Sequence, residues 1–311
     1  MNKERSNFQY GSAICYSGYR DGQSPMIEIY PSYDQIKEDL LILAGEWTYL
    51  RLYDCSVHAE TVIEVIQKER LDFKVMLGAS IDAEANNPGC PWGGSYSESV
   101  LLENKNSNEE QIDKLIDLAN QYPETVFSLS VGNEATAEWT DHLVPVDRVI
   151  GFVRKVKAGA SQAVTFCENY VPWLDKLEPL VAEVDFISLH TYPIWEYKGI
   201  EEAIGYSKDN YYSVAHKYPD KPIVITEAGW ATGANGKGIP AEVANEELQS
   251  RYCADLMDWT RKEKILTFVF EAFDEPWKGS SDPMEPEKHW GLYAVDRKPK
   301  NIVNQLHSTR V

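Results

Sequence analysis

Two glutamates at the ends of apolar runs are the residues of this sequence that could most clearly do chemistry. Glu134 ends the run Phe127-Ser-Leu-Ser-Val-Gly-Asn-Glu134, and Glu227 lies within Pro222-Ile-Val-Ile-Thr-Glu-Ala-Gly-Trp230. Both runs are short and rich in β-branched residues, which is typical of buried parallel strands. A carboxylate costs free energy in such a place unless its charge or its proton is used. Two of them can divide acid–base and nucleophilic work, as the cleavage of a glycosidic bond requires.

The elements that must position these glutamates alternate along the chain. Apolar runs that indicate strands occupy residues 11–16, 49–53, 73–79, 127–134, 163–166, 184–190, 222–227 and 265–270. Amphipathic patterns indicate the helices. One follows the capping box Ser32-Tyr-Asp-Gln35, and another follows residue 54. The remaining patterns occupy residues 109–121, 146–157, 172–181, 200–218, 242–262 and 300–307. Such alternation predicts a parallel sheet, and eight units in about 300 residues predict a (β/α)₈ TIM barrel. An open doubly wound sheet is the alternative, but no Gly-rich phosphate loop follows the first run.

The domain organisation is expected to be simple. No linker or change of composition divides the chain, so residues 1–311 are interpreted as one catalytic domain. Residues 1–9 are expected to be a disordered or tag-derived start. Residues 80–108 are rich in Asn, Gly, Pro and Ser and predict a long loop, which in a compact domain is usually functional or disordered.

The active site of such a barrel lies at the C-terminal ends of its strands. The residues expected there as ligand contacts around Glu134 and Glu227 are Tyr16, Arg51, Tyr53, Asn133, His190, Tyr192, Trp230, Glu271, Glu275, Trp277 and Lys278. Carboxylates, amides and aromatic rings suit a neutral polyhydroxylated ligand, whereas phosphates would require more Arg and Lys. Arg51 is expected to keep a neighbouring carboxylate ionised.

Other interpretations of these residues stay open. Either glutamate alone could be a structural carboxylate paired with Arg51 or Lys278, because ion-pair networks also occupy clefts. His190 could join Asp54 or Glu271 as a metal ligand, but no second His lies at ligand spacing, so neither a metal nor a cofactor is expected. Four tryptophans fall near the predicted strand ends: Trp195, Trp230, Trp277 and Trp290. Each of them alone is expected to pack in the core, but as a group they predict that one or two stack on a sugar ring.

Composition excludes several classes of partner. The formal net charge of −19 disfavours nucleic acid and anionic membranes. No segment is long and apolar enough to cross a bilayer.

The cysteines are odd in number and lack metal-ligand spacing, which indicates free and mostly buried thiols: Cys15, Cys55, Cys90, Cys167 and Cys253.

Further motifs carry a resemblance to a known family. Val131–Glu134 and Ile225–Trp230 occur together with four other motifs, at Tyr49–Asp54, Asp185–Pro193, Phe270–Lys278 and Glu287–Tyr293. In this order, over nearly the whole chain, they resemble glycoside hydrolase family 17, the β-1,3-glucanases, in its bacterial laminarinase form. The resemblance implies that Glu134 is the general acid/base, that Glu227 is the nucleophile, and that Asn133 hydrogen-bonds the sugar 2-hydroxyl. Ala228 departs from the Thr of many plant members.

The resemblance implies a retaining, endo-acting hydrolase of laminarin-like β-1,3-glucan. Such an enzyme needs Glu134 protonated and Glu227 ionised, with their carboxyl groups roughly 5–5.5 Å apart. A β-1,3-glucan transglycosylase is the nearest alternative, and a non-catalytic glucan-binding protein a further one. A polymeric substrate predicts action in the periplasm, at the cell surface or after secretion, with the leader removed. The protein is expected to be a monomer. Cytoplasmic action on imported oligosaccharides is the alternative.

Overall fold

Short parallel strands form a closed barrel in the computed structural model, which describes residues 8–308. The strands are β1 (Ser12–Cys15), β2 (Tyr49–Leu52), β3 (Lys74–Gly78), β4 (Val126–Asn133), β5 (Ala163–Asn169), β6 (Ile187–Thr191), β7 (Ile223–Ala228) and β8 (Thr267–Val269). Each strand pairs with the next along the chain, and β8 pairs with β1 through Phe268 and Ala13. The predicted (β/α)₈ barrel is therefore confirmed, and every observed strand overlaps its predicted range.

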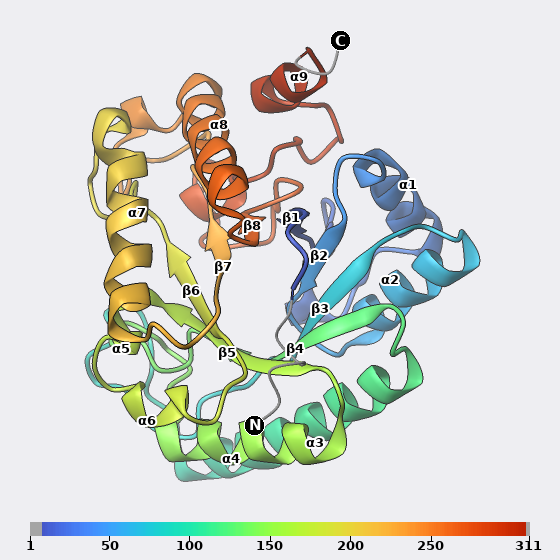
Figure 1. Ribbon diagram of the computed structural model, residues 1–311, viewed down its shortest axis with the longest axis vertical. Coiled ribbons are helices and arrows are strands. Elements are labelled where there is room, and N and C mark those ends of the chain that lie inside the picture. The colour runs from blue at the N-terminus through green and yellow to red at the C-terminus, as the bar shows by residue number, and fades with distance from the viewer. Residues whose placement is uncertain (1–7, 309–311) are drawn as a thin grey trace.

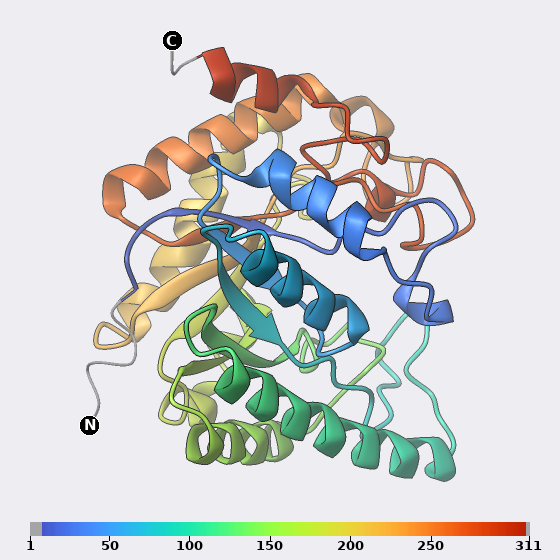
Figure 2. The same ribbon diagram turned by 90° about the vertical axis from the view of Figure 1, so that its right-hand side faces the viewer.

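Helices surround the barrel and cover its outer face (Figure 1). They are α1 (Tyr33–Leu43), α2 (Val57–Lys68), α3 (Glu98–Gln121), α4 (Val146–Gly159), α5 (Tyr170–Trp173), α6 (Glu178–Val181), α7 (Ile200–Lys217), α8 (Glu246–Glu263) and α9 (Asn301–Ser308). Helices α1, α2 and α3, blue to green in Figure 2, lie one below another in sequence order on the side that faces the viewer. The predicted capping box opens α1: Ser32 accepts from the Gln35 N–H, and the Gln35 side chain accepts from Ser32.

The prediction of a loop over 80–108 is wrong in its second half, because α3 begins at Glu98. The N-cap is Ser97, whose hydroxyl accepts from the Val100 N–H. Asn104 and Asn108, one helical turn apart, hold this part of α3 against the segment after β3 with hydrogen bonds. The Asn104 amide donates to Ala83 O at 2.8 Å, and the Asn108 amide to Asp82 O at 2.9 Å. Because these contacts are polar, the apolar periodicity that identifies a helix is missing.

Two other predicted helices are divided. The expected helix at 242–262 is a short 3₁₀ turn, Ala241–Val243, followed by α8. Asn245 separates the two because its side chain caps α8 by accepting from the Leu248 N–H at 3.0 Å. The expected helix at 172–181 is the two single turns α5 and α6, and β5 before it runs three residues past the predicted end.

Phe8 closes the N-terminal end of the barrel. Its ring meets Phe127 edge-on at a centroid distance of 5.7 Å and Phe186 at 4.6 Å. The expected disordered start over residues 1–9 is therefore wrong at Phe8, because a ring inside the barrel end removes apolar surface from water. Residues 1–7 of that prediction lie outside the described part of the chain.

All five cysteines are free and buried, as predicted. None of the helices between residues 8 and 308 has the length and apolar character of a membrane span.

Candidate active site

Strand β4 delivers Glu134 to the C-terminal end of the barrel. The residue directly follows β4, and its N–H donates to Cys167 O on β5 at 2.9 Å. Its backbone is left-handed, with φ of 47°, two residues after Gly132 with φ of 148°. A left-handed non-glycine residue costs on the order of 1–3 kcal/mol, and such strain concentrates at functional sites.

Strand β7 delivers Glu227 to the same end, and His190 of β6 lies between the two glutamates. The His190 Nδ1 atom is 2.8 Å from Glu134 Oε1 and 3.3 Å from Glu227 Oε2. One carboxylate oxygen of each glutamate and this nitrogen all lie within 4.8 Å of one another. This proximity is compatible with the roughly 5–5.5 Å separation of the carboxyl groups in retaining glycosidases.

Three donors surround the Glu227 carboxylate. Arg51 Nη1 donates to Oε1 at 2.6 Å, Tyr53 OH donates to Oε1 at 3.0 Å, and Tyr192 OH donates to Oε2 at 2.7 Å. Arg51 also donates to Asn133 Oδ1 through Nη2. One buried guanidinium thus connects the nucleophile candidate on β7 to the amide that precedes Glu134 on β4.

The charges at the site favour an ionised Glu227. Burial raises the pKa of Glu227, but the cations His190 and Arg51 and the Tyr192 hydroxyl together hold it below its usual value. Burial lowers the pKa of His190, but Glu227, Cys167 and Glu134 raise it to about 10. His190 is therefore an imidazolium at neutral pH, and its Nδ1–H donates to Glu134.

A second ionic cluster follows β8. Lys278 Nζ contacts Glu271 Oε2 at 2.8 Å and Glu275 Oε2 at 2.7 Å. Burial raises the pKa of Glu271 well above its usual value, with a further contribution from Glu275 and opposition from Lys278. Lys278 holds the pKa of Glu275 below its usual value despite burial. Trp277 is half-buried beside this cluster, with the Lys278 ammonium 5.9 Å from its ring centre.

Two of the aromatic side chains predicted as ligand contacts are fully buried. Trp230 has no exposed surface, and its indole N–H donates to Val243 O at 2.8 Å. Tyr16 is buried too, and its hydroxyl donates to Asp39 at 3.1 Å. Because neither side chain has an exposed face to offer a ligand, the prediction that they touch one is wrong for this structure. Asp54 instead shapes the start of α2, because its carboxylate accepts from the Ser56 N–H and hydroxyl.

Three acidic or basic residues near the pair carried no role in the sequence analysis. Glu168 is the last residue but one of β5, and the charge of Glu134 acts on it. It could have been found as an acid at a strand end, but the predicted strand stopped two residues before it. Glu287 lies in a 3₁₀ turn. Burial raises its pKa to about 7, Glu134 and Glu227 contribute to the rise, and Lys278 opposes it. His142 places Nε2 2.9 Å from Asn133 O and Nδ1 2.8 Å from Asp141. No sequence pattern indicated His142.

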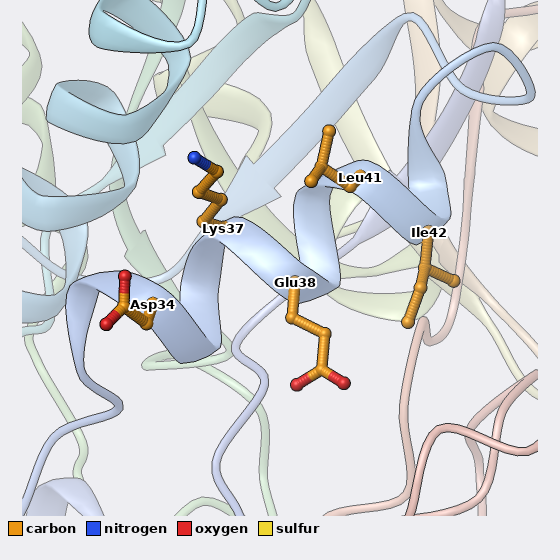
Figure 3. A pocket seen from close by; sticks show the side chains of 5 residues that line it. All are labelled: Asp34, Lys37, Glu38, Leu41 and Ile42. Atoms are coloured by element: carbon orange, nitrogen blue, oxygen red, sulfur yellow. The ribbon is translucent and has the colours of Figure 1, made fainter.

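Glu134, His190 and Glu227 are also close enough to hold a metal ion. The donor set disagrees with that role, because the Arg51 cation and the Tyr53 and Tyr192 hydroxyls already donate to the Glu227 carboxylate. An open hollow of about 490 Å³ lies elsewhere, on α1 (Figure 3). The five side chains that line it all belong to this outer helix: Asp34, Lys37, Glu38, Leu41 and Ile42. The hollow is therefore separate from the carboxylate pair.

A closed (β/α)₈ barrel with a carboxylate pair at the C-terminal ends of β4 and β7 defines the class of double-carboxylate barrel glycosidases. The comparison of the sequence with protein families agrees. The sequence profile of the BtgE/BtgC glycoside hydrolase domain matches residues 13–291, and the chain belongs to this family.

Individual relatives are distant. A glucan 1,3-beta-glucosidase of Arthroderma benhamiae is 31% identical over 132 residues, 38% of this chain and 41% of that protein. A probable glucan endo-1,3-beta-glucosidase btgC of Aspergillus terreus is 24% identical over 305 residues, 90% of this chain and 43% of that protein. The chain thus spans less than half the length of these curated relatives. The crystal structure of an endo-laminarinase from Formosa Hel1_33_131 superposes with a TM-score of 0.82 at 27% identity, covering 96% of this chain and 87% of that one.

Proposed function

We propose that this protein is a retaining glycoside hydrolase that cleaves β-1,3-glucan, such as laminarin, within the chain. The observation that carries the proposal is the pair Glu134 and Glu227, with oxygens within 4.8 Å of each other at the C-terminal end of the barrel. The family, the btgC relative and the endo-laminarinase likeness support the choice of β-1,3-glucan as substrate.

The reaction proceeds in two displacements. Glu227, kept ionised by Arg51 and His190, attacks the anomeric carbon, while Glu134 donates its proton to the leaving glycosidic oxygen. A covalent glycosyl-enzyme forms on Glu227. Glu134 then takes a proton from the incoming water, which attacks the anomeric carbon from the other face, so the β configuration is restored. Asn133, oriented by Arg51 and His142, is placed next to the acid to bind the sugar 2-hydroxyl.

Proton NMR of laminarin digestion tests this proposal directly. Early β-anomeric reducing ends with the wild type, and none with Glu227→Gln, are expected. Early α-anomers would mean inversion and would overturn the roles of both glutamates. Binding of laminarin without turnover by the wild type would favour a glucan-binding protein instead. Products longer than the starting oligosaccharide would mean that sugar rather than water resolves the intermediate, which is transglycosylation.

We also propose that the protein acts as a monomer in the periplasm or outside the cell, where a polymeric glucan is accessible. Fractionation of the organism that makes it, followed by immunodetection, tests the location. A cytoplasmic pool alone would instead favour action on imported oligosaccharides. Sedimentation equilibrium tests the monomer, and a mass near twice 35.3 kDa would refute it.

A further inference from the structure

Trp92 is a large aromatic side chain that the two-displacement mechanism leaves without a role. Among residues 8–308 it is the tryptophan with the most exposed surface, at 66%. None of the ring contacts or hydrogen bonds found in that part of the chain involves its indole. A single exposed ring carries no inference by itself, but the way in which the chain presents Trp92 does.

The loop that carries Trp92 is rigid. The Asn87 N–H donates to Gly94 O at 2.7 Å and closes the loop at its base. Gly94 has φ of 81°, and a Cβ there would lie 2.7 Å from Asn87 O, so only glycine fits. Pro88 and Pro91 fix φ at two further positions. The backbone at Trp92 is therefore held in one place, and little ordering entropy would be lost when a ligand binds there.

The same loop is joined to the loop that follows β4. The Asn87 side-chain amide donates to Glu138 O at 2.9 Å and to Thr140 O at 2.7 Å. Gly93 lies against Asp141, since a Cβ at Gly93 would be 3.3 Å from the Asp141 Cβ. Both loops leave the C-terminal end of the barrel, where the active site of this fold lies. Together they form one continuous surface.

A short series of contacts connects this surface to the acid/base glutamate. Asp141 Oδ1 is 2.8 Å from His142 Nδ1, and His142 Nε2 is 2.9 Å from Asn133 O. Asn133 directly precedes Glu134. The position of the joined loops is therefore fixed relative to Glu134.

The surface lies on the side of the barrel from which the leaving part of the substrate extends. Glu134 donates its proton to the glycosidic oxygen, so the leaving sugar begins beside β4. Strand β3 pairs with β4 and lies four strands from β7 in either direction around the barrel. A polysaccharide that extends from Glu134 away from Glu227 therefore passes over the loops that follow β3 and β4.

The chemistry of the surface suits a sugar chain. The faces of a β-linked glucose ring are lined by C–H groups, and an indole offers a flat apolar face. Trp139, 36% exposed, adds a second ring on the joined loop. The Asp141 carboxylate, 47% exposed, can accept from sugar hydroxyls. This carboxylate and the net charge of −19 disfavour an anionic ligand.

We propose that Trp92 is a distal binding residue for the leaving part of the glucan: it stacks on a sugar beyond the one that carries the leaving oxygen. The contact makes the enzyme prefer long chains over short ones. Binding energy gained far from the reacting carbon raises kcat/KM only for substrates that are long enough to reach it. This inference rests on the proposed function.

The first test compares two substrates. Laminariheptaose is long enough to reach Trp92 on the leaving side, whereas 4-methylumbelliferyl β-laminaribioside has no sugar there. In Trp92→Ala, kcat/KM is expected to fall about tenfold with laminariheptaose, as for the loss of an aromatic anchor, and less than about twofold with the aryl glycoside. Equal losses with both substrates, or no loss with laminariheptaose, would overturn the inference. Failure of the wild type to hydrolyse either substrate would instead refute the proposed function.

Two further variants serve as controls. Trp92→Phe keeps an aromatic face and should retain kcat/KM with laminariheptaose within about threefold. Leu102→Ala removes a side chain that is 62% exposed on the outer helix α3, and kcat/KM should stay unchanged with both substrates. A loss in Leu102→Ala equal to that in Trp92→Ala would mean that the effect is not specific to the ring and would contradict the inference.

A third measurement needs no turnover. In Glu227→Gln, the indole N–H resonance of Trp92 is identified by its absence after the additional change Trp92→Phe. This resonance is expected to shift when laminariheptaose is added. Binding of laminariheptaose without a shift of this resonance would refute the inference and leave the proposed function intact.

Discussion

Arg51→Met removes the buried cation that binds the nucleophile candidate. Arg51 and Glu227 are both almost fully buried, with 2% and 6% of their side chains exposed. The substitution keeps most of the side-chain volume and leaves the Glu227 carboxylate without its closest cation. It also removes the donor to Thr226 O, at 3.0 Å, and to Asn133. The loss is therefore electrostatic rather than a loss of packing.

The magnitude follows from burial. Breaking a buried ion pair by removing one partner costs about 3–5 kcal/mol, because the remaining charge stays desolvated. His190, Tyr53 and Tyr192 still contact Glu227, so the lower half of that range, about 3–4 kcal/mol at pH 7, is expected. At about 2 °C per kcal/mol for a chain of this size, the melting temperature should fall by about 6–8 °C.

The pH dependence has a definite sign. The pKa of Glu227 is depressed in the folded protein, so its contribution to stability is present above the unfolded value of about 4.3 and lost as pH falls through the folded value. Without Arg51 the folded pKa rises, and protonation then relieves the buried charge. The deficit of Arg51→Met should therefore be largest at pH 7 and shrink towards pH 4.5.

Urea unfolding of the wild type and Arg51→Met at pH 7 and pH 4.5 measures both effects. The matched control is Arg251→Met, which breaks an exposed pair with Glu201 and should leave the free energy of unfolding nearly unchanged at either pH. A deficit for Arg51→Met below about 1 kcal/mol, or one equal at the two pH values, would contradict the buried-charge argument.

Three further substitutions test other parts of the structure. His190 has a raised pKa of about 10, so its stabilising contribution is fully present below about pH 6.5 and lost as pH rises through 10. In thermal melts, the wild type should lose stability as pH rises from about 6.5 to about 10, and His190→Gln should not. An identical loss in both proteins would refute the charge assigned to His190. Tyr192→Phe removes a donor to Glu227, so kcat/KM should fall about 10–100-fold and the acid limb of its pH profile move to higher pH; an unchanged acid limb counts against this. Phe8→Ala should cost about 2–3 kcal/mol in urea unfolding, because it empties the closed end of the barrel, and a cost below 0.5 kcal/mol would mean that Phe8 contributes no core packing.

The sequence was most informative about the site where a charged residue follows an apolar run. Glu134 and Glu227 stand out because an acid at the end of an apolar run has no reason to be there except its chemistry. Arg51 and His190 were predicted at the same strand ends. That His190 lies between the glutamates depends on the stagger of β4, β6 and β7, which no local pattern encodes.

The errors share a physical cause, since each involves contacts made across the fold. The first turns of α3 are held by asparagine side chains instead of an apolar face. Trp230 is an aromatic ring three residues after Glu227 and near a strand end, yet the chain turns it into the interior against Tyr252. Side-chain direction after the end of a strand is set by tertiary packing, so residue type alone does not predict it.

The position of Phe8 decides where the chain meets the barrel. It lies at the end opposite Glu134 and Glu227, and the strands run from one end to the other. A fusion partner or a surface linker joined upstream of Phe8 therefore departs from the closed end, about the length of a strand away from the scissile bond. If the protein is immobilised through that end, the C-terminal end of the barrel, which holds Glu134 and Glu227, should face the solution. Under the proposed function, long polysaccharide chains should then be digested at nearly the rate of the free protein.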